Sequence, residues 1–482
     1  MAEYSELTAE LVAELADIVG AENCLTGEDI NEDYGRDEMP LYGTRMPDAV
    51  VLPACTEEVS AVMKLAFDHD VPVTVRGAGT GLVGGCTPLA GGIVLCTMRM
   101  GEILEYDMEN LFVRVQPGVR LCDLAADALE RGLMYPPDPG EKTGSIGGNV
   151  STNAGGMRAV KYGTTRDYVL AMTAVLPDGE IVRLGREVAK SSSGYSLLHL
   201  MIGSEGTLGV ITEVSLRLIA APREDMSFIL SFSDIATAIS AVPQIKLAGL
   251  NPQSIEFMER DIVDSSAAYT GNRIIPTTVG GNECGAYILV TLDGADPDEI
   301  FQRAETLAAI GEEAGAFDTL VIDHPSDKAS VWAARSAFLT VIEAETEHLD
   351  EMDVVVPVNR IAEFLGFVHD AGERHGVRIR SFGHAGDGNL HIYCCGNGIG
   401  KDEFTAKTSR IMDEAYEKCA QLGGQVSGEH GIGHAKKGYL RDSAGERAFA
   451  LMAGIKQVFD PKGILNPGKV CGGLPPHDRA SA

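Results

Sequence analysis

The chain has 482 residues, of which 45% are hydrophobic, so it can bury a large core, and its length favours two or three domains. Seventy acidic against 39 basic residues give a formal net charge of -31, which disfavours nucleic acid and anionic lipid as partners. No apolar run approaches the roughly 20 residues of a membrane span, and the acidic start at Met1 to Tyr4 is unlike a basic signal peptide. We therefore expect a cytoplasmic globular protein.

The ten cysteines are scattered and include no Cys-x-x-Cys pair. This distribution argues against a cysteine-ligated cluster, a zinc finger or a dense disulfide framework. Cys394 and Cys395 lie beside His391 in the sequence, but strand packing accounts for them better than redox chemistry does.

The first predicted element is a short amphipathic helix that packs rather than reacts. Ser5 is its expected cap and Gly20 its expected stop. Its apolar face consists of Leu7, Leu11, Leu15 and Ile18.

A β-α-β pattern follows, with a strand from Ala49, a helix over 56–68 and a second strand over 71–75. It leads into the glycine-rich loop 76–85, whose backbone N-H groups can approach an anion such as a phosphate. The loop is not a dinucleotide-binding Rossmann turn, because Leu82 stands where the third glycine is required and Pro88 interrupts a following helix.

A second glycine-rich loop covers Thr143 to Gly156 and follows predicted strands at 93–97 and 112–116 and a helix at 121–130. Long loops of small residues commonly bind ligands. This one offers glycines for close backbone approach and four side chains that can hydrogen-bond a polar ring edge or a pyrophosphate: Ser145, Asn149, Thr152 and Asn153.

A hairpin near the C-terminal end carries two histidines. The stretch 381–395 alternates apolar and polar residues on both sides of Gly386-Asp387-Gly388-Asn389, which predicts two strands with His384 and His391 at the ends of their turn. Glu429, in the glycine-rich stretch 427–433, supplies a third ligand. Two imidazoles and one carboxylate leave coordination positions open, so we expect a substrate-binding divalent metal such as zinc, manganese or iron.

The order of these motifs resembles a known family. Arg76-Gly77-x-Gly79-Thr80, then 146–156, then the Gly206 to Glu213 segment resemble the FAD-binding domain of the vanillyl-alcohol-oxidase type. The hairpin, the 428–431 motif and the segment 460–469 are similar to the D-lactate, glycolate and D-2-hydroxyglutarate dehydrogenase branch of that family.

The resemblance implies an α+β fold in three segments. Residues 1–222 would form an FAD-binding domain of two subdomains, 223–458 a substrate (cap) domain with the metal site and a mostly antiparallel sheet, and 459–482 a tail that returns to the flavin. The pattern after Pro222 agrees, since it predicts strands and helices in alternation. These are strands at 228–232, 254–258 and 287–292 and helices at 235–247, 297–314, 402–421 and 444–459.

The same resemblance assigns the residues that contact FAD. They are Arg76, Gly77, Ala78, Gly79, Thr80, Gly81, Thr143, Gly144, Ser145, Gly148, Asn149, Thr152, Asn153, Ala154, Gly155, Gly206, Val210, Ile211 and Asn466. Relatives with a covalently linked flavin carry a histidine in the first loop, where this chain has Thr80, so we expect noncovalent FAD.

Oxidation of a 2-hydroxy acid requires a base, a carboxylate anchor and the flavin. His430 is the expected base, because imidazole titrates near neutral pH and a neighbouring metal acidifies the hydroxyl. By resemblance, Arg335 is the expected anchor for the substrate carboxylate, and Tyr393 is a further candidate donor. Each of these residues also has an ordinary structural alternative: His430 could cap a turn, Arg335 could lie on the surface, and Tyr393 could pack within a strand.

The substrate is expected to be a small monocarboxylate. D-2-hydroxyglutarate dehydrogenases of this branch carry a threonine and a lysine where this chain has Leu339 and Glu351-Met352, and that loss disfavours a second carboxylate. D-lactate is therefore the preferred substrate and glycolate the second, with D-2-hydroxyglutarate as the alternative.

Two other functions fit parts of the sequence, namely a metal-dependent hydrolase and a noncatalytic FAD subunit of a redox complex. The electron acceptor stays open among an electron-transfer flavoprotein, an iron-sulfur subunit, quinone and oxygen. A homodimer is one expected assembly.

Overall fold

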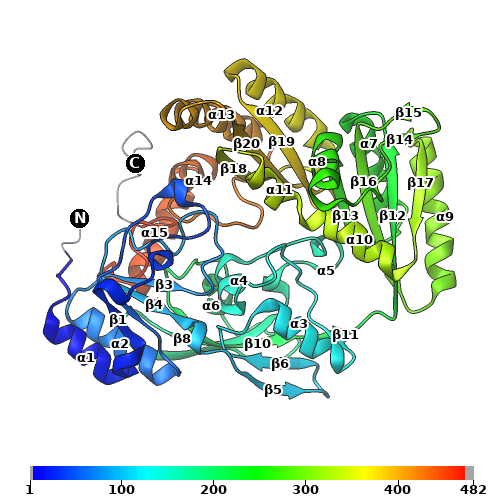
Figure 1. The fold of residues 1–482 in the computed structure, drawn as a ribbon. Coiled ribbons are helices and arrows are strands. Elements are labelled where there is room, and N and C mark those ends of the chain that lie inside the picture. Colours follow the sequence, from blue (N-terminus) through cyan, green and yellow to red (C-terminus); the bar gives the residue numbers. More distant parts are fainter. Residues whose placement is uncertain (1–3, 473–482) are drawn as a thin grey trace. The chain divides into compact units, whose positions relative to one another are not determined.

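The computed structural model describes residues 4–472, which divide into two compact units (Figure 1). Unit 1 comprises Met1–Ala154, Thr164–Ala221 and Glu429–Ala482, and unit 2 comprises Gly155–Gly163 and Pro222–Gly428. The division expected from the sequence, at 222 and 458, stays a prediction about domain function. By contacts, residues 429–458 group with unit 1, and residues 473–482 of the expected tail lie outside the described part.

Unit 1 contains two principal sheets. The first has the order β1-β2-β4-β3, in which β2, β4 and β3 are parallel, as a β-α-β pattern requires. Its strands are β1 Cys24–Thr26, β2 Ala49–Val51, β3 Val73–Arg76 and β4 Ile93–Cys96. The second is antiparallel, in the order β5-β6-β10-β8-β9. Its strands are β5 Ile103–Asp107, β6 Phe112–Val115, β8 Val169–Val175, β9 Ile181–Gly185 and β10 Val210–Arg217.

Within residues 4–472, unit 1 contains seven principal helices. They are α1 Ala9–Val19, α2 Thr56–Asp68, α3 Leu121–Glu130, α4 Ile146–Thr152, α6 Leu197–Met201, α14 Lys437–Ala444 and α15 Glu446–Phe459. The first five bury apolar residues, whereas α14 and α15 bury only Lys437 and Lys456. The predictions for 56–68 and 121–130 are confirmed. A short pair, β7 Leu133–Met134 and β11 Ile219–Ala220, completes the unit.

The sequence prediction for unit 1 has one wrong cap, and it missed one helix. The first helix is capped by Thr8, whose hydroxyl accepts a hydrogen bond from Leu11 N, and not by Ser5, whose backbone N-H instead donates to Asp70 O. The helix expected at 444–459 forms as α15, and the helix α14 that precedes it was not predicted. Gly445, with a left-handed φ of 78°, separates the two helices.

Unit 2 is built on one antiparallel sheet of seven strands in the order β17-β12-β16-β13-β19-β20-β18. Its strands are β12 Glu224–Phe232, β13 Ser254–Glu259, β16 Ala286–Gly294, β17 Asp318–Ile322, β18 His348–Val355, β19 Arg378–His384 and β20 Asn389–Gly396. The expected antiparallel α+β architecture is confirmed. A small hairpin, β14 Thr278–Val279 and β15 Asn282–Glu283, lies outside this sheet.

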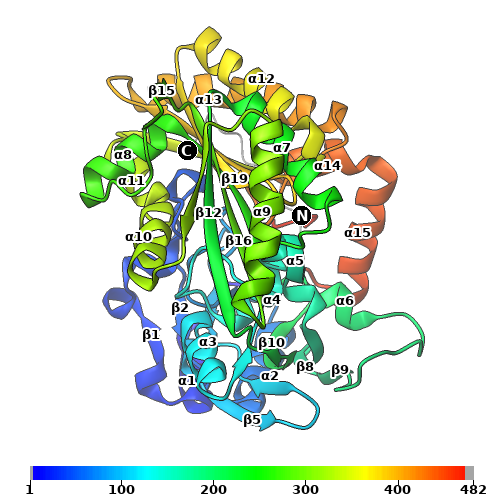
Figure 2. The ribbon, with the colours of Figure 1, turned by 90° about the vertical axis from the view of Figure 1, so that its right-hand side faces the viewer.

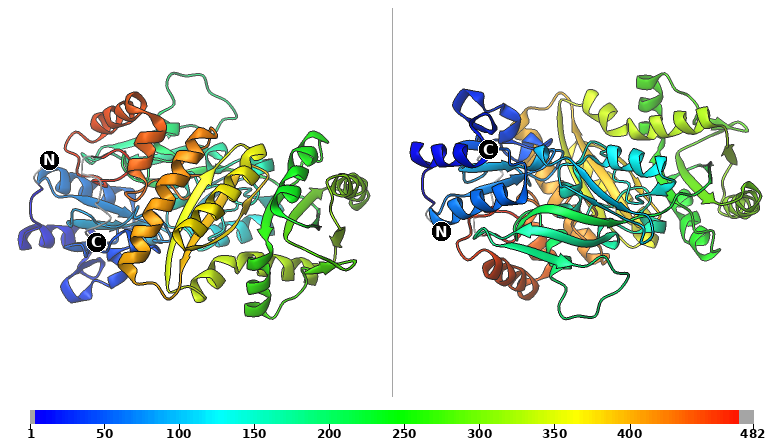
Figure 3. Two further views of the ribbon diagram at one scale, coloured as in Figure 1. Left: turned by 90° about the horizontal axis from the view of Figure 1, so that it is seen from above. Right: turned by 90° about the horizontal axis from the view of Figure 1, so that it is seen from below.

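Helices cover both faces of the seven-stranded sheet (Figure 2). One face packs on α8 Arg260–Thr270, α10 Pro325–Ser336 and α11 Phe338–Ala344. The other face packs on α7 Ile235–Leu247, α9 Pro297–Glu313, α12 Ile361–His375 and α13 Lys401–Gln421, and α12 and α13 lie side by side (Figure 3). The short helix α5 Ala159–Tyr162 joins this unit through hydrogen bonds from Lys161 and Tyr162 to Asp293.

No helix within residues 4–472 is long and apolar enough to span a bilayer.

Candidate active site

The register of the seven-stranded sheet gathers polar side chains on one face. Glu256 of β13 lies opposite His384 of β19, and His391 of β20 lies between Phe382 of β19 and Asp353 of β18. Residues directly opposite each other in an antiparallel pair project to the same side, and alternate residues along a strand share that side. The group therefore shares the face that packs on α8, α10 and α11.

The turn of the β19-β20 hairpin forms as the sequence predicts. Gly388 has a φ of 90°, and a Cβ there would lie 2.0 Å from Val356 O, so the position requires glycine. Asp387 Oδ1 accepts a hydrogen bond from Asn389 N at 3.1 Å and closes the turn. His384 ends the first strand and His391 is the third residue of the second.

The two histidines of the hairpin face each other through their Nε2 atoms, which lie 3.4 Å apart. Bonds of about 2.0–2.1 Å from each nitrogen to one tetrahedral ion would separate the nitrogens by about 3.3 Å. Both side chains are buried, with 5% of each residue exposed. This pair therefore fits two ligands of a single divalent metal.

The carboxylate of Asp353 fixes the chain that carries Glu429 and His430. Its Oδ2 accepts hydrogen bonds from Ser427 Oγ at 2.8 Å and Gly428 N at 2.9 Å, and its Oδ1 accepts one from Asn389 Nδ2 at 2.7 Å. The next two residues in the chain are Glu429 and His430.

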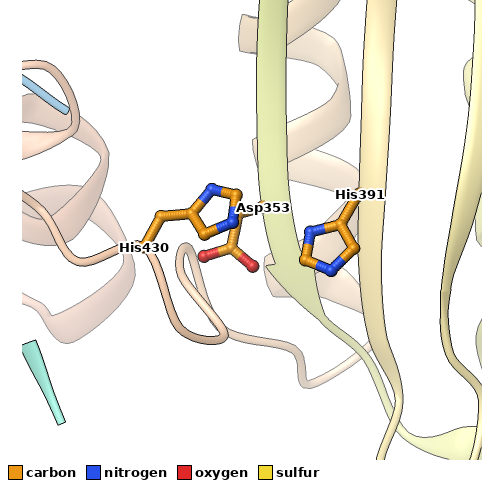
Figure 4. A group of neighbouring side chains, drawn as sticks. All are labelled: Asp353, His391 and His430. Atoms are coloured by element: carbon orange, nitrogen blue, oxygen red, sulfur yellow. The ribbon is translucent and has the colours of Figure 1, made fainter. Parts of the chain in front are cut away.

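Two sets of three residues could each hold a metal ion, because the ligand atoms within each set lie within 4.8 Å of one another. The set expected from the sequence is His384, His391 and Glu429. The other set is Asp353, His391 and His430 (Figure 4). Each set offers imidazole and carboxylate donors, which suit zinc, manganese or iron. Because both Asp353 oxygens already accept hydrogen bonds, the first set is better suited to hold the ion.

Arg335 reaches the same sheet face from α10. Its Nε and Nη2 donate to Glu256 Oε2 at 3.1 and 2.7 Å, and its guanidinium lies 4.5 Å from the centre of the Phe382 ring. Nη1 has no hydrogen-bond acceptor among residues 4–472. The alternative that Arg335 lies on the surface is wrong, since the residue is only 6% exposed. The Nη1 group of its guanidinium is available to a ligand.

Glu256 was not singled out by the sequence and is the centre of this group. Its Oε2 binds Arg335, its Oε1 lies 2.7 Å from His384 Nδ1, and the residue is fully buried. Burial raises the pKa of its carboxyl, but His384 and Arg335 together hold that pKa below its ordinary value. The available signal was a charged residue inside the apolar strand Ser254-Ile255-Glu256-Phe257-Met258.

Tyr393 lies two residues beyond His391 and stacks on Phe382, with ring centres 5.4 Å apart. Burial, followed by the nearby Glu351 carboxylate, raises the pKa of its hydroxyl well above the ordinary value. It is part of an apolar cluster that also contains Leu339 as a half-buried member. Tyr393 is therefore packed as a strand residue, and a role as donor to substrate stays a prediction.

Three predicted FAD-contacting segments of unit 1 converge. A Cβ on Gly77 would lie 2.2 Å from Ser145 Oγ, and one on Gly144 would lie 3.3 Å from Asn149 Oδ1 and 3.5 Å from Thr80 Oγ1. The first and second glycine-rich loops are thus in contact, and glycine is required for that approach. Asn149 Nδ2 is buried and has no partner among the described residues, as expected of a donor that awaits a ligand.

The third segment and the C-terminal motif meet at Asn466. This residue accepts a hydrogen bond from Val75 N at 2.9 Å and donates one to Glu205 O at 2.7 Å. Gly206 has a φ of 68°, and a Cβ there would lie 2.8 Å from Asn466 Nδ2. The side chain of Asn466 therefore joins β3, the strand that leads into the first loop, to the 204–207 turn.

Other predicted FAD residues have partners within the protein. Arg76 donates to Arg36 O at 2.6 Å, and the carbonyl side of Asn153 accepts from Arg166 N at 2.9 Å. Thr152 donates to Gly148 O at 3.2 Å, while Val210 and Ile211 are buried in β10. The contacts of these residues to FAD stay predictions. The same applies to Gly155, which is the first residue of unit 2.

Two buried lysines lie beside these loops and were missed by the sequence analysis. Lys436 and Lys469 are 1% and 0% exposed, and neither Nζ has a hydrogen-bond partner among residues 4–472. Glu205, which accepts from Ile432 N and Gly433 N, and Asp37, which accepts from Gly84 N, are the neighbouring carboxylates. Unpaired buried ammonium groups are costly, so an anionic ligand fits this part of unit 1.

Comparison with known proteins identifies the family of this chain. Residues 47–185 match the family "FAD binding domain" and residues 221–470 match "FAD linked oxidases, C-terminal domain". The chain is 50% identical over 469 residues to a D-lactate dehydrogenase of Anaerostipes hadrus, covering 97% of this chain and 98% of that protein. It is 36% identical over 468 residues to the glycolate oxidase subunit GlcD of Bacillus subtilis, covering 96% and 97%.

Solved structures agree on the fold. The chain superimposes on p-cresol methylhydroxylase with a TM-score of 0.78 at 16% identity, covering 96% of both chains. It superimposes on 4-ethylphenol oxidase from Gulosibacter chungangensis with a TM-score of 0.77 at 20% identity, covering 97% of both. The fold is therefore that of the vanillyl-alcohol-oxidase type flavoproteins.

The chain belongs to the family of FAD-linked oxidases. Within that family it is an FAD-dependent enzyme of the D-lactate dehydrogenase and glycolate oxidase type.

Proposed function

We propose that this flavoenzyme oxidises a small D-2-hydroxy acid, with D-lactate preferred and glycolate second, to the 2-oxo acid, and passes the electrons to a partner carrier. The observation that carries the proposal is that Glu256 contacts both His384 and Arg335 on one face of the seven-stranded sheet, where His391 faces His384. Family membership favours this function over a metal-dependent hydrolase or a noncatalytic subunit.

The proposed roles follow from the donors that each residue offers. The free Nη1 of Arg335 binds the substrate carboxylate, and His430 accepts the hydroxyl proton. His384, His391 and Glu429 are the residues that would hold a divalent metal, which would supply Lewis-acid stabilisation of the developing alkoxide. FAD, when bound, would supply the hydride acceptor. Three attachment points around one carbon select one hand of the substrate.

The surroundings of Arg335 support a short substrate. Leu339, one turn after Arg335 in the chain, packs in an apolar cluster, and Glu351 is a buried carboxylate with 1% exposure. A second substrate carboxylate near either residue would be desolvated without a cation. This is the reason to place D-2-hydroxyglutarate below D-lactate.

Anaerobic flavin reduction tests the substrate directly. D-lactate is expected to bleach the flavin fastest, ahead of glycolate, L-lactate and D-2-hydroxyglutarate, when all four are mixed with the enzyme at equal concentration in a stopped-flow spectrophotometer. Faster reduction by D-2-hydroxyglutarate would overturn the proposed substrate size, and faster reduction by L-lactate would overturn the proposed handedness.

FAD is expected to be bound without a covalent link. Thr80 offers a hydroxyl where a flavin-linked relative would carry a histidine, and a hydroxyl is a poor partner for such a bond. Acid precipitation should therefore release all of the yellow colour into the supernatant. Colour that stays with the washed pellet would contradict this expectation.

The proposed electron acceptor is a separate carrier, either an electron-transfer flavoprotein, an iron-sulfur subunit or a quinone. All ten cysteines of the chain are free thiols, of which five are buried and five partly exposed. Six of them belong to unit 1 and four to unit 2. An iron-sulfur station on a partner chain is consistent with this distribution.

A further inference from the structure

We propose that Glu256 is a positioning residue that orients both the metal ligand His384 and the substrate anchor Arg335, so that one buried carboxylate couples the metal site to the carboxylate site. This inference rests on the proposed function, because it assigns the residue that holds two of its groups in place. The carrying observation is that the two Glu256 oxygens are divided between them, Oε1 to His384 Nδ1 and Oε2 to Arg335.

The contact with His384 fixes which ring nitrogen can bind a cation. A carboxylate that accepts a hydrogen bond from Nδ1-H leaves the Nε2 lone pair as the only acceptor on the ring. That Nε2 is the atom that faces His391 Nε2 at 3.4 Å. Glu256 therefore presents His384 in the tautomer that a metal requires.

The contact with Arg335 fixes the direction of its fork. With Nε and Nη2 both directed to Glu256 Oε2 and the guanidinium plane held against Phe382, rotation of the side chain would break two charged hydrogen bonds. Nη1 is the remaining donor. A neutral or shortened residue at 256 would release Arg335 and His384 together.

The ordinary alternative is that Glu256 only neutralises a buried arginine. On that reading its loss would affect folding and substrate binding, but it would leave the metal affinity of the folded protein unchanged. Metal affinity therefore separates the two roles.

The test compares Glu256→Gln with Glu259→Gln in the purified, FAD-containing protein. Glu259 is a matched control, because it lies on the same strand, is 9% exposed and also contacts a histidine, His369 Nε2 at 3.0 Å. Each metal-stripped protein is titrated with Co²⁺, and binding is followed by the ligand-field absorbance. KM and kcat for D-lactate are then measured in the reconstituted proteins.

Glu256→Gln is expected to weaken Co²⁺ binding roughly 10-fold to 100-fold and to raise KM for D-lactate, with flavin content unchanged, while Glu259→Gln retains wild-type Co²⁺ affinity. Equal Co²⁺ affinity in wild type and Glu256→Gln would overturn the inference. Absence of Co²⁺ binding by the wild type would instead overturn the proposed metal site.

Where Glu256→Gln does not fold, Glu256→Asp gives the same decision. It keeps a negative charge beside Arg335 but shortens the side chain by one methylene, which withdraws the carboxylate oxygens from both His384 and Arg335. Weaker Co²⁺ binding by Glu256→Asp supports positioning, and wild-type Co²⁺ binding by this variant overturns it.

Discussion

Replacing His391 by alanine is expected to lower kcat for D-lactate by about 10³-fold, equivalent to about 4 kcal/mol of lost transition-state stabilisation, while FAD remains bound. The imidazole is buried on β20 and faces His384 Nε2, so its removal leaves a metal with at most two of three proposed protein ligands. His384→Ala and Glu429→Ala should have the same effect. The measurements are turnover, flavin absorbance and metal content by elemental analysis.

His375→Ala is the matched control for these variants. His375 is in the same unit but contacts Glu414 of α13 at 2.8 Å and belongs to neither candidate ligand set. It should retain metal and turnover. A fully active His391→Ala protein, or an active wild-type protein that contains none of zinc, manganese and iron in stoichiometric amount, would show that the proposed metal is not used.

Replacing Lys469 by methionine is expected to stabilise the flavin-free protein and to weaken its binding of FAD. Burial lowers the pKa of the Lys469 ammonium group to about 8 from 10.5, although Cys86, Asp37 and Glu205 oppose the shift. The difference between these two pKa values corresponds to about 3 kcal/mol of destabilisation of the folded protein at pH 7. An apolar side chain of similar length removes this destabilisation. Loss of a charged donor to an anionic cofactor should weaken FAD binding roughly 10-fold to 100-fold.

The pH dependence gives this prediction a sign. Between pH 8 and 10.5 the unfolded chain binds a proton at Lys469 that the folded protein lacks. The free energy of unfolding of the wild type therefore increases as pH rises through this interval. The difference between Lys469→Met and wild type, measured by denaturant unfolding, should therefore fall from about 3 kcal/mol at pH 7 towards zero at pH 10.5.

Lys462→Met is the control for the lysine, because Lys462 lies in the same segment but hydrogen-bonds Phe67 O at 2.7 Å and pairs with Asp70 at 2.9 Å. It should bind FAD as the wild type does. Wild-type FAD affinity in Lys469→Met would contradict the assignment of Lys469 to the cofactor side of unit 1.

Much of the fold could be predicted because it depends on local pattern. The helices at 56–68, 121–130 and 235–247 begin and end where their apolar spacing indicates. The β19-β20 hairpin follows from alternation around a glycine turn, so His384 and His391 could be brought together from sequence alone. The domain division and the FAD-contacting residues were predicted from the resemblance to a known family.

The parts that could not be predicted depend on strand order. Glu256 meets His384 across 128 positions of sequence, because β13 pairs with β19 and not with a neighbour in the chain. Nothing in a periodicity selects that pairing. The same holds for Lys469, whose nearby carboxylates Asp37 and Glu205 come from distant segments. The cap at Thr8 was missed because Ser5, a residue of the same capping class, precedes it.

The contribution of the last segment to the core of unit 1 has a consequence for biosynthesis. Ile464 and Leu465 are fully buried among residues of α1, α2 and β3, and Leu465 forms a parallel bridge with Val73. These residues are synthesised after the other segments that build this core, so the nascent chain cannot complete the core before residue 465 has been translated. Residues 222–428 of unit 2 emerge earlier and are nearly continuous. Unit 2 can thus acquire its structure during synthesis before the core of unit 1 is complete.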